Sequence, residues 1–169
     1  MDILPAITAR WSAKRFLPRK IGREPLERIL HAGRLAPSAK NRQEWRFIVV
    51  SRSDLRDRLA NAAFGAEQIA TAPIIIAVCT TNIDYRMPNG QLSYPVDLSI
   101  ATAFMMLQAT HEGIGSSAMT TFDEQEVQDL LSVPHAMRVV IMLALGYTDQ
   151  EPPARVRKSL SDIVAYEHW

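Results

Sequence analysis

Apolar residues recur along the chain with two periods, one typical of helices and one typical of strands. The helical period predicts helices over Glu24–Ala36, Ser53–Ala63, Ala66–Thr71, Val96–Glu112 and Asp123–Leu131. Runs rich in β-branched and aromatic residues predict strands over Trp45–Val50, Pro73–Thr80, Ser116–Met119 and Arg138–Tyr147. Because helices and strands mix without a regular strand–helix–strand rhythm, the pattern predicts the α+β fold class.

The longest predicted helix, Val96–Glu112, is apolar almost all round. Such a helix is either the buried centre of the fold or part of an interface between subunits. We expect its Phe104 and the Met105–Met106 pair to be interface core rather than substrate contacts. Gly113 and Gly115 follow the helix and are typical of a helix end.

Two segments show neither the helical period nor the strand period. Ile83–Pro95 contains two prolines and an Asn-Gly pair, which predict an irregular loop. Four side chains are candidates to line a pocket, although ordinary packing is the better explanation for each of them. They are Tyr85, Met87 and Tyr94 in this loop, and Phe122. Gln150–Arg157 is rich in proline and predicts an exposed arm, which the tail Asp162–Trp169 follows.

The length of 169 residues predicts one domain, 1–169, with residues 150–169 as its C-terminal arm. A net charge of +1 offers no field of one sign, so we expect neither nucleic acid nor an anionic membrane as a partner. The start of the chain lacks a basic region followed by a long apolar one, and no apolar run approaches the roughly 20 residues that span a bilayer. We therefore expect a cytoplasmic protein.

Several kinds of site are absent from the sequence. The single cysteine, Cys79, excludes an internal disulfide and a site with several thiolates, and it ends an apolar run that predicts a buried strand position. The four histidines are scattered without metal-ligand spacing, so no metal site is expected. Neither a G-x-S-x-G turn nor a glycine-rich phosphate loop is present. A phosphorylated ligand would therefore have to be held by cationic side chains.

Two clusters of cations could do this. Arg10, Ser12 and Lys14 alternate in sequence, so in extended backbone they would share one face. A guanidinium can bind two phosphate oxygens while a nearby hydroxyl donates to a third. The second cluster, Arg155 and Arg157, lies in the C-terminal arm. Taken alone, the first cluster is better explained as a solvated basic turn.

A third polar segment, Pro37–Phe47, follows the first long helix. Small residues at Ser38 and Ala39 allow close approach of a ligand to the backbone, and Asn41 and Gln43 offer amide donors and acceptors. The segment could be an ordinary polar loop. Together with the two cationic clusters, it describes a site for a polar ring system with a phosphate tail.

These segments resemble the FMN-dependent nitroreductase family over nearly the whole chain. Arg10-x-Ser12-x-Lys14-x-Phe16 is similar to the opening of that family, and Pro37-Ser38-Ala39 with Asn41, Gln43, Trp45 and Phe47 is similar to its second motif. Further similarities, in the same order, are Ala72-Pro73 before the apolar run, Asp97 with Gly113-Ile114-Gly115-Ser116, Leu130 to Pro134, and Leu145-Gly146-Tyr147.

The resemblance implies a central mixed β-sheet flanked by helices, and an intertwined homodimer with FMN at the interface. It implies that Arg10 and Ser12 hold the phosphate with Arg155 and Arg157, and that Trp11 adds backbone contacts. Lys14 would lie near the pyrimidine edge of the flavin, and backbone N–H groups near Thr120 and Thr121 would face its N5. The second chain would contribute Pro37, Ser38, Ala39 and Asn41.

The implied activity is transfer of hydride from NADH or NADPH, through the flavin, to a nitroaromatic, quinone or similar acceptor in a ping-pong reaction. Lys14 would stabilise the reduced, anionic flavin more than the oxidised ring and would tune its potential, so no side chain is a covalent catalyst. The sequence departs from the family at Glu44, where proline is usual, and at Gln68, where larger relatives can carry a second lysine. A dedicated flavin dehydrogenase or dehalogenase, a flavin-binding carrier or sensor without turnover, and a dimer that binds another phosphate ligand remain alternatives.

Overall fold

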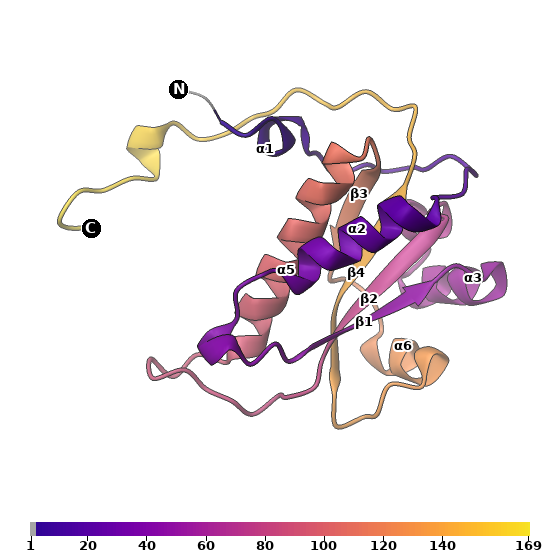
Figure 1. The fold of residues 1–169 in the computed structure, drawn as a ribbon, viewed down its shortest axis with the longest axis horizontal. Helices are drawn as coiled ribbons and strands as arrows, with labels where there is room; N and C mark the ends of the chain where they lie inside the picture. Colours follow the sequence, from indigo (N-terminus) through magenta and orange to yellow (C-terminus); the bar gives the residue numbers. More distant parts are fainter. Residues whose placement is uncertain (1–2) are drawn as a thin grey trace.

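The computed structural model describes residues 3–169 and contains one four-stranded sheet of order β1-β2-β4-β3. Its strands are β1 (Trp45–Val50), β2 (Ile74–Thr80), β3 (Gly115–Met119) and β4 (Arg138–Gly146). Figure 1 shows the sheet with helices on both of its faces. The predicted α+β class is confirmed, and each strand begins and ends within one residue of its predicted bounds.

The expectation of a mixed sheet is wrong for the pairing of the four strands. All three strand pairs are antiparallel. Within residues 3–169, the parallel pairing is confined to an isolated bridge between Ser12 and Ser116, at the outer edge of β3. The sheet therefore gains a parallel element only where the N-terminal segment lies against β3.

Helices cover the two faces of the sheet as separate layers. On one face lie α2 (Arg23–Arg34) and the long α5 (Ser93–His111), which pack on each other and on the sheet. On the other face lie α3 (Ser53–Ala62), α4 (Glu67–Ala70) and α6 (Glu124–Leu131). A short helix, α1 (Pro5–Ala9), precedes them, and two single turns of 3-10 helix, η1 (Ala39–Asn41) and η2 (Leu160–Asp162), complete the set.

Strand β2 is buried on both faces, as its nearly continuous apolar run predicts. Because side chains alternate along a strand, Ile75 and Ala77 join the core beneath α3 and α6, whereas Ile74 and Ile76 join the core beneath α2 and α5. Cys79 is buried at the end of this strand, and burial raises its pKa to about 11. The thiol is therefore protonated at neutral pH and is a packing residue, as predicted.

Helix α5 begins three residues earlier than predicted, at Ser93, and is buried along one side. Met105 and Met106 lie within the core of their own chain, with exposed fractions of 0% and 8%, so the expectation that they form a subunit interface was wrong. The cause is the glycine on the facing helix: a Cβ on Gly33 would lie 2.8 Å from Cγ of Met105, so α2 and α5 approach closely enough to enclose this side chain. Phe104, by contrast, is 38% exposed.

The predicted start of α6 is confirmed in detail. The Asp123 carboxylate accepts a hydrogen bond of 3.0 Å from the backbone N–H of Glu126, which satisfies a donor that the helix itself leaves free. The backbone N–H of Asp123 also donates to the carbonyl of Ala62, 2.8 Å away, at the end of α3. These two bonds fix the chain immediately after Thr120 and Thr121.

Residues 151–169 are exposed throughout, as the proline-rich arm predicts. Figure 1 shows this segment leaving the sheet after β4, passing α1 and ending away from the body of the chain. Its large apolar side chains lie in water in a single chain, and they are Val156, Leu160, Ile163, Val164, Tyr166 and Trp169. Within residues 3–169, no helix is long and apolar enough to cross a membrane.

Candidate functional site

The cationic segment, residues 10–16, contains the first cluster and lies along the outer edge of β3. Beyond the bridge between Ser12 and Ser116, the backbone N–H of Ala13 donates to the carbonyl of Ser116 over 3.1 Å. Ala13 is fully buried, whereas Ser12 and Lys14 on either side of it are exposed. This alternation confirms that Ser12 and Lys14 share the outward face of an extended segment.

A glutamine that the sequence analysis did not single out fixes the middle of this segment. Oε1 of Gln150 accepts hydrogen bonds from the backbone N–H groups of Lys14, at 3.1 Å, and Arg15, at 3.0 Å. The contact joins positions more than 130 residues apart in sequence, so no local pattern could have indicated it. It holds the start of the C-terminal arm against the cationic segment.

The two cationic clusters meet through Arg155. Its Nη2 donates to the backbone carbonyl of Arg10 over 2.5 Å, which brings the guanidinium of Arg155 to the backbone of the first cluster. Arg157 is exposed, and its Nη1 donates to the neighbouring carbonyl of Val156, a local bond. The structure therefore places three of the four predicted phosphate ligands on one stretch of backbone and its neighbour: Arg155 contacts Arg10, and Ser12 follows two residues later.

The remaining residues predicted on this side surround the same edge. Trp11 packs half-buried against the core beneath α3 and α6, as do Met119 and Phe122. Thr120 and Thr121 are exposed and follow β3 directly. Gln68 is half-buried on α4, whose end is tied to the cationic segment because Oγ1 of Thr71 accepts a hydrogen bond of 3.0 Å from the N–H of Phe16.

The polar loop, residues 37–44, follows α2 and is held in a tight conformation by side chains. The backbone N–H of Ala39 donates to Oδ1 of Asp97 over 3.0 Å, and that of Gln43 donates to Oγ of Ser38 over 3.0 Å. Lys40, Asn41 and Gln43 have left-handed backbone, with φ of 53°, 53° and 55°. Asp97 is buried in the first turns of α5, and this burial raises its pKa above the usual range.

Pro37 and Asn41 are exposed in this loop, and Ser38 and Ala39 are half-buried. The loop lies at the beginning of α5, through Asp97, whereas the cationic segment lies beyond the end of α5, through Ser116. His111 lies 14 positions after Asp97, a separation of about 21 Å along the helix. One chain therefore does not bring the two halves of the predicted site together (Figure 1).

The aromatic candidates for a pocket are also dispersed. Tyr94 packs with the core beneath α2 and α5, and Phe122 packs with the core on the opposite face of the sheet. Met87 is half-buried within its own loop, where its N–H donates to the carbonyl of Gln91. Tyr85 is different, because its ring lies 4.0 Å from the guanidinium carbon of Arg42.

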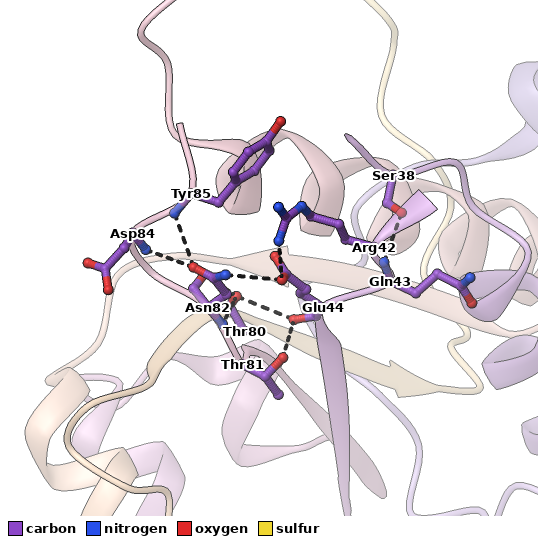
Figure 2. Close-up of polar contacts among 9 residues, drawn as sticks. All are labelled: Ser38, Arg42, Gln43, Glu44, Thr80, Thr81, Asn82, Asp84 and Tyr85. Carbon is purple, nitrogen blue, oxygen red and sulfur yellow. Dashed lines mark hydrogen bonds and ion pairs between the residues drawn. The ribbon is translucent and has the colours of Figure 1, made fainter. Parts of the chain in front are cut away.

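Figure 2 shows the polar cluster to which Arg42 and Tyr85 belong. Oε1 of Glu44 accepts hydrogen bonds from Nη1 of Arg42, at 3.3 Å, and from Nδ2 of Asn82, at 3.0 Å. Oδ1 of Asn82 accepts in turn from the backbone N–H groups of Asp84, at 2.9 Å, and Tyr85, at 3.0 Å. The position at which this chain departs from the expected proline is thus the centre of a network between two loops.

The described residues contain no group of three or more histidine, cysteine, aspartate or glutamate side chains that could hold a metal ion. Exposed cations along a backbone segment that is itself held by Ser116 and Gln150 are instead suited to a phosphate group. The antiparallel sheet, the buried helix across it and this cationic edge define an α+β fold with a candidate site for an anionic ligand.

The chain belongs to the nitroreductase family, whose family model matches residues 7–147. A relative from Archaeoglobus fulgidus, provisionally named NADH dehydrogenase/NAD(P)H nitroreductase, is 31% identical over 154 residues, which cover 89% of this chain and 87% of the relative. The crystal structure of a nitroreductase family protein from Clostridium difficile 630 superposes with a TM-score of 0.88 at 30% identity and covers 100% of both chains. An FMN-dependent nitroreductase from Clostridium difficile R20291 shares the fold, with a TM-score of 0.86 at 23% identity over 99% of this chain and 100% of that one.

Proposed function

We propose that this protein is an FMN-dependent oxidoreductase that moves hydride from NADH or NADPH to a nitroaromatic, quinone or similar acceptor. The observation that carries the proposal is the meeting of Arg10 and Arg155 beside the exposed Ser12. Family membership and a neighbour named as FMN-dependent support the flavin, and the name of the Archaeoglobus relative supports a nicotinamide donor.

Arg10, Ser12, Arg155 and Arg157 would hold the phosphate of FMN, with backbone contacts from Trp11. The residues present fit this group, because the exposed Ser12 and the guanidinium of Arg155, which donates to the carbonyl of Arg10, belong to one backbone segment that is held by Ser116. Charge-assisted hydrogen bonds from guanidinium to phosphate are about twice as strong as neutral ones.

Lys14 would lie near the pyrimidine edge of the flavin. Its side chain is exposed while its backbone N–H is fixed by Gln150, so the ammonium projects from a defined point. Bound FMN would supply the two-electron chemistry, accepting hydride from the nicotinamide and passing it to the acceptor in turn. An ammonium at that edge stabilises negative charge on the ring and so raises its affinity for electrons.

Thr120, Thr121 and Gln68 would complete the site in the same chain. Backbone N–H groups near the two threonines can donate to N5, because this segment is fixed between β3 and the capped start of α6. Gln68 offers a neutral donor from α4. These groups orient the ring and hold a hydrogen bond; none of them is a nucleophile.

The second half of the site would come from another copy of the chain. Pro37, Ser38, Ala39 and Asn41 lie beyond the opposite end of α5 from the phosphate-binding residues, so a homodimer is needed to bring both halves to one flavin. The exposed apolar side chains of residues 156–169 fit this arrangement, because burying them against a second chain would remove them from water. Residues 1–169 would then be one FMN-binding domain whose arm, 150–169, contacts the partner.

The test begins with an absorption spectrum of the purified protein after reconstitution with FMN, followed by anaerobic titration with NADH and, separately, NADPH. Flavin bands that bleach by two electrons and return on addition of menadione or nitrofurazone are the expected result. Bands that persist with both nicotinamides would favour a flavin-binding carrier or sensor over a reductase. Failure to bind FMN would overturn the proposal.

A further inference from the structure

We propose that Glu44 is a positioning residue that ties the polar loop 37–44 to the loop 80–85 and thereby sets the affinity for FMN. This inference rests on the proposed function, in which the polar loop contacts the flavin of the partner's site. It concerns a residue at which this chain departs from the usual sequence of its family. Figure 2 shows the contacts that carry it.

The Glu44 carboxylate receives donors from both loops. Nη1 of Arg42 comes from the polar loop itself, and Nδ2 of Asn82 comes from the segment after β2. The side chain of Glu44 is only 18% exposed, whereas that of Arg42 is 37% exposed. The pair is therefore partly desolvated, and a contact of this kind contributes more than an ion pair fully in water.

Asn82 transmits the contact further. Its amide nitrogen donates to Glu44 while its amide oxygen accepts from the N–H groups of Asp84 and Tyr85, so one side chain links Glu44 to the turn that carries Tyr85. Arg42 lies over the Tyr85 ring at 4.0 Å and completes a closed set of contacts between the loops. Displacing either loop would break several of these contacts together.

The second Glu44 oxygen argues that the network is not explained by stability alone. Oε2 is buried and has no hydrogen-bond partner among the described residues. A buried, unpaired carboxylate oxygen costs free energy. Closing the loop alone would not require this cost, because the Glu44 carbonyl already binds the neighbouring segment through the N–H of Thr81.

The side chain of Glu44 can be altered without breaking the main-chain attachment of the loop. The Glu44 carbonyl accepts a hydrogen bond of 2.9 Å from the N–H of Thr81, and this bond does not depend on the side chain. The far end of the loop is held separately, because Asp97 accepts from the N–H of Ala39. Loss of the carboxylate should therefore loosen residues 40–43 while β1, β2 and α5 remain folded.

The experiment compares FMN dissociation constants of the dimer, measured by flavin fluorescence, for wild type and for Glu44→Ala. We expect the variant to bind FMN about tenfold more weakly, the loss that follows from removing hydrogen bonds to a charged group. Glu44→Gln retains an oxygen acceptor and should stay within about threefold of wild type. Glu126→Ala removes an exposed carboxylate from α6 and is the matched control, with unchanged affinity.

A polarity swap separates positioning from a general loss of structure. Asn82→Asp keeps the acceptor for the N–H groups of Asp84 and Tyr85 but replaces the donor to Glu44 with a like charge, so FMN binding should weaken. In the double variant E44Q/N82D, the amide introduced at position 44 can donate to the carboxylate introduced at position 82. Recovery of FMN affinity in the double variant is the expected result, and additive losses would overturn the proposal.

Hydrogen exchange in the FMN-free protein supplies a readout that does not depend on activity. In Glu44→Ala, the amides of Gln43, Asp84 and Tyr85 should exchange faster, while those of β2 remain as protected as in wild type. Wild-type protein that fails to bind FMN would refute the proposed function. Wild-type protein that binds FMN, with Glu44→Ala equal to it in affinity and exchange, would refute the role of Glu44 alone.

Discussion

The guanidinium of Arg155 donates to the backbone carbonyl of Arg10 across 145 positions of sequence. This bond uses one N–H of Arg155 and none of the Arg10 side chain, so both guanidinium groups keep donors for an anion. It also places the first residues of the exposed arm beside the N-terminal segment. In the proposed function, phosphate binding and the path of the arm are therefore connected through this contact.

Removing this pair should weaken FMN binding strongly. We expect Arg10→Ala together with Arg155→Ala to raise the FMN dissociation constant by about a hundredfold, the loss of two charge-assisted hydrogen bonds. Fluorescence titration at two salt concentrations measures it, and the salt dependence should shrink in the variant. Arg58→Ala on the exposed side of α3 is the control. Unchanged affinity in the double variant would remove these residues from the phosphate site.

Lys14 should tune the flavin rather than bind it. Lys14→Ala is expected to lower the two-electron potential of bound FMN, on the order of 30 mV for each tenfold loss of preference for the reduced ring. Spectroelectrochemical titration reads the potential directly, with Lys20→Ala as an exposed control. A potential equal to that of wild type would show that the ammonium lies away from the ring.

Truncation of the arm should separate subunit contact from phosphate binding. Ending the chain after Arg157 keeps both arm arginines but removes the exposed side chains of Leu160, Ile163 and Trp169. We expect the shortened protein to dissociate at concentrations where the full chain is a dimer, because less apolar surface is buried. Size exclusion with light scattering measures the change. A flavin-loaded monomer of the full chain would contradict the shared site.

The ion pair between α2 and Glu112, the residue that follows α5, should give stability that depends on pH. Arg28 makes two bonds to Glu112, of 2.7 and 2.8 Å, and this hydrogen bonding lowers the pKa of Glu112 from 4.5 to about 2. A depressed folded-state pKa stabilises the fold fully above about pH 4.5, and the contribution is lost as pH falls toward 2. We expect Glu112→Gln to lower the melting temperature by about 2–4 °C at pH 7 and by much less near pH 2.

The control for this prediction is the exposed pair within α2. Arg23 donates to Glu27 over 2.6 Å, but both side chains are more than half exposed, at 89% and 57%. Solvent screens such a pair, so Glu27→Gln should leave the melting temperature nearly unchanged at every pH. Equal changes in melting temperature for the two glutamine variants would show that the contact between Arg28 and Glu112 adds nothing to stability.

Gly146 should tolerate no side chain. A Cβ there would lie 2.7 Å from Cδ of Pro73 and 2.8 Å from Cβ of Phe16, and neither atom belongs to a flexible chain end. Gly146→Ala is therefore expected to cost about 1–3 kcal/mol of unfolding free energy, the usual range for overpacking. Denaturant unfolding measures it, with Gly22→Ala as the control, since a Cβ there meets its nearest atom at an ordinary 3.5 Å.

The sequence predicted the elements of this fold because their signals are local. The apolar run of β2 and the helical period from Asp123 to Leu131 each depend on a few consecutive residues, and both elements are found where they were expected. The burial of Met105 could not be predicted in this way, since it depends on the close approach that Gly33 allows from another helix. Helical period alone does not tell core from interface.

The same distinction between local and distant signals applies to the candidate site. Arg10, Ser12 and Arg155 were selected by residue type and order, and the structure places them at one edge. Gln150 and Asn82 were missed because each acts through partners far away in sequence. Glu44 was noticed only as a departure from the family, and its network became visible once the two loops were in place.

The length of α5 has a consequence for the living cell. Since the polar loop and the cationic edge lie at opposite ends of this helix, a single copy of the chain would hold the two halves of the proposed site apart. For the proposed shared site, cofactor retention then becomes a function of protein concentration: dilution that separates subunits releases flavin, and flavin in turn opposes separation. The amount of active enzyme would therefore rise more steeply than the amount of protein that the cell makes.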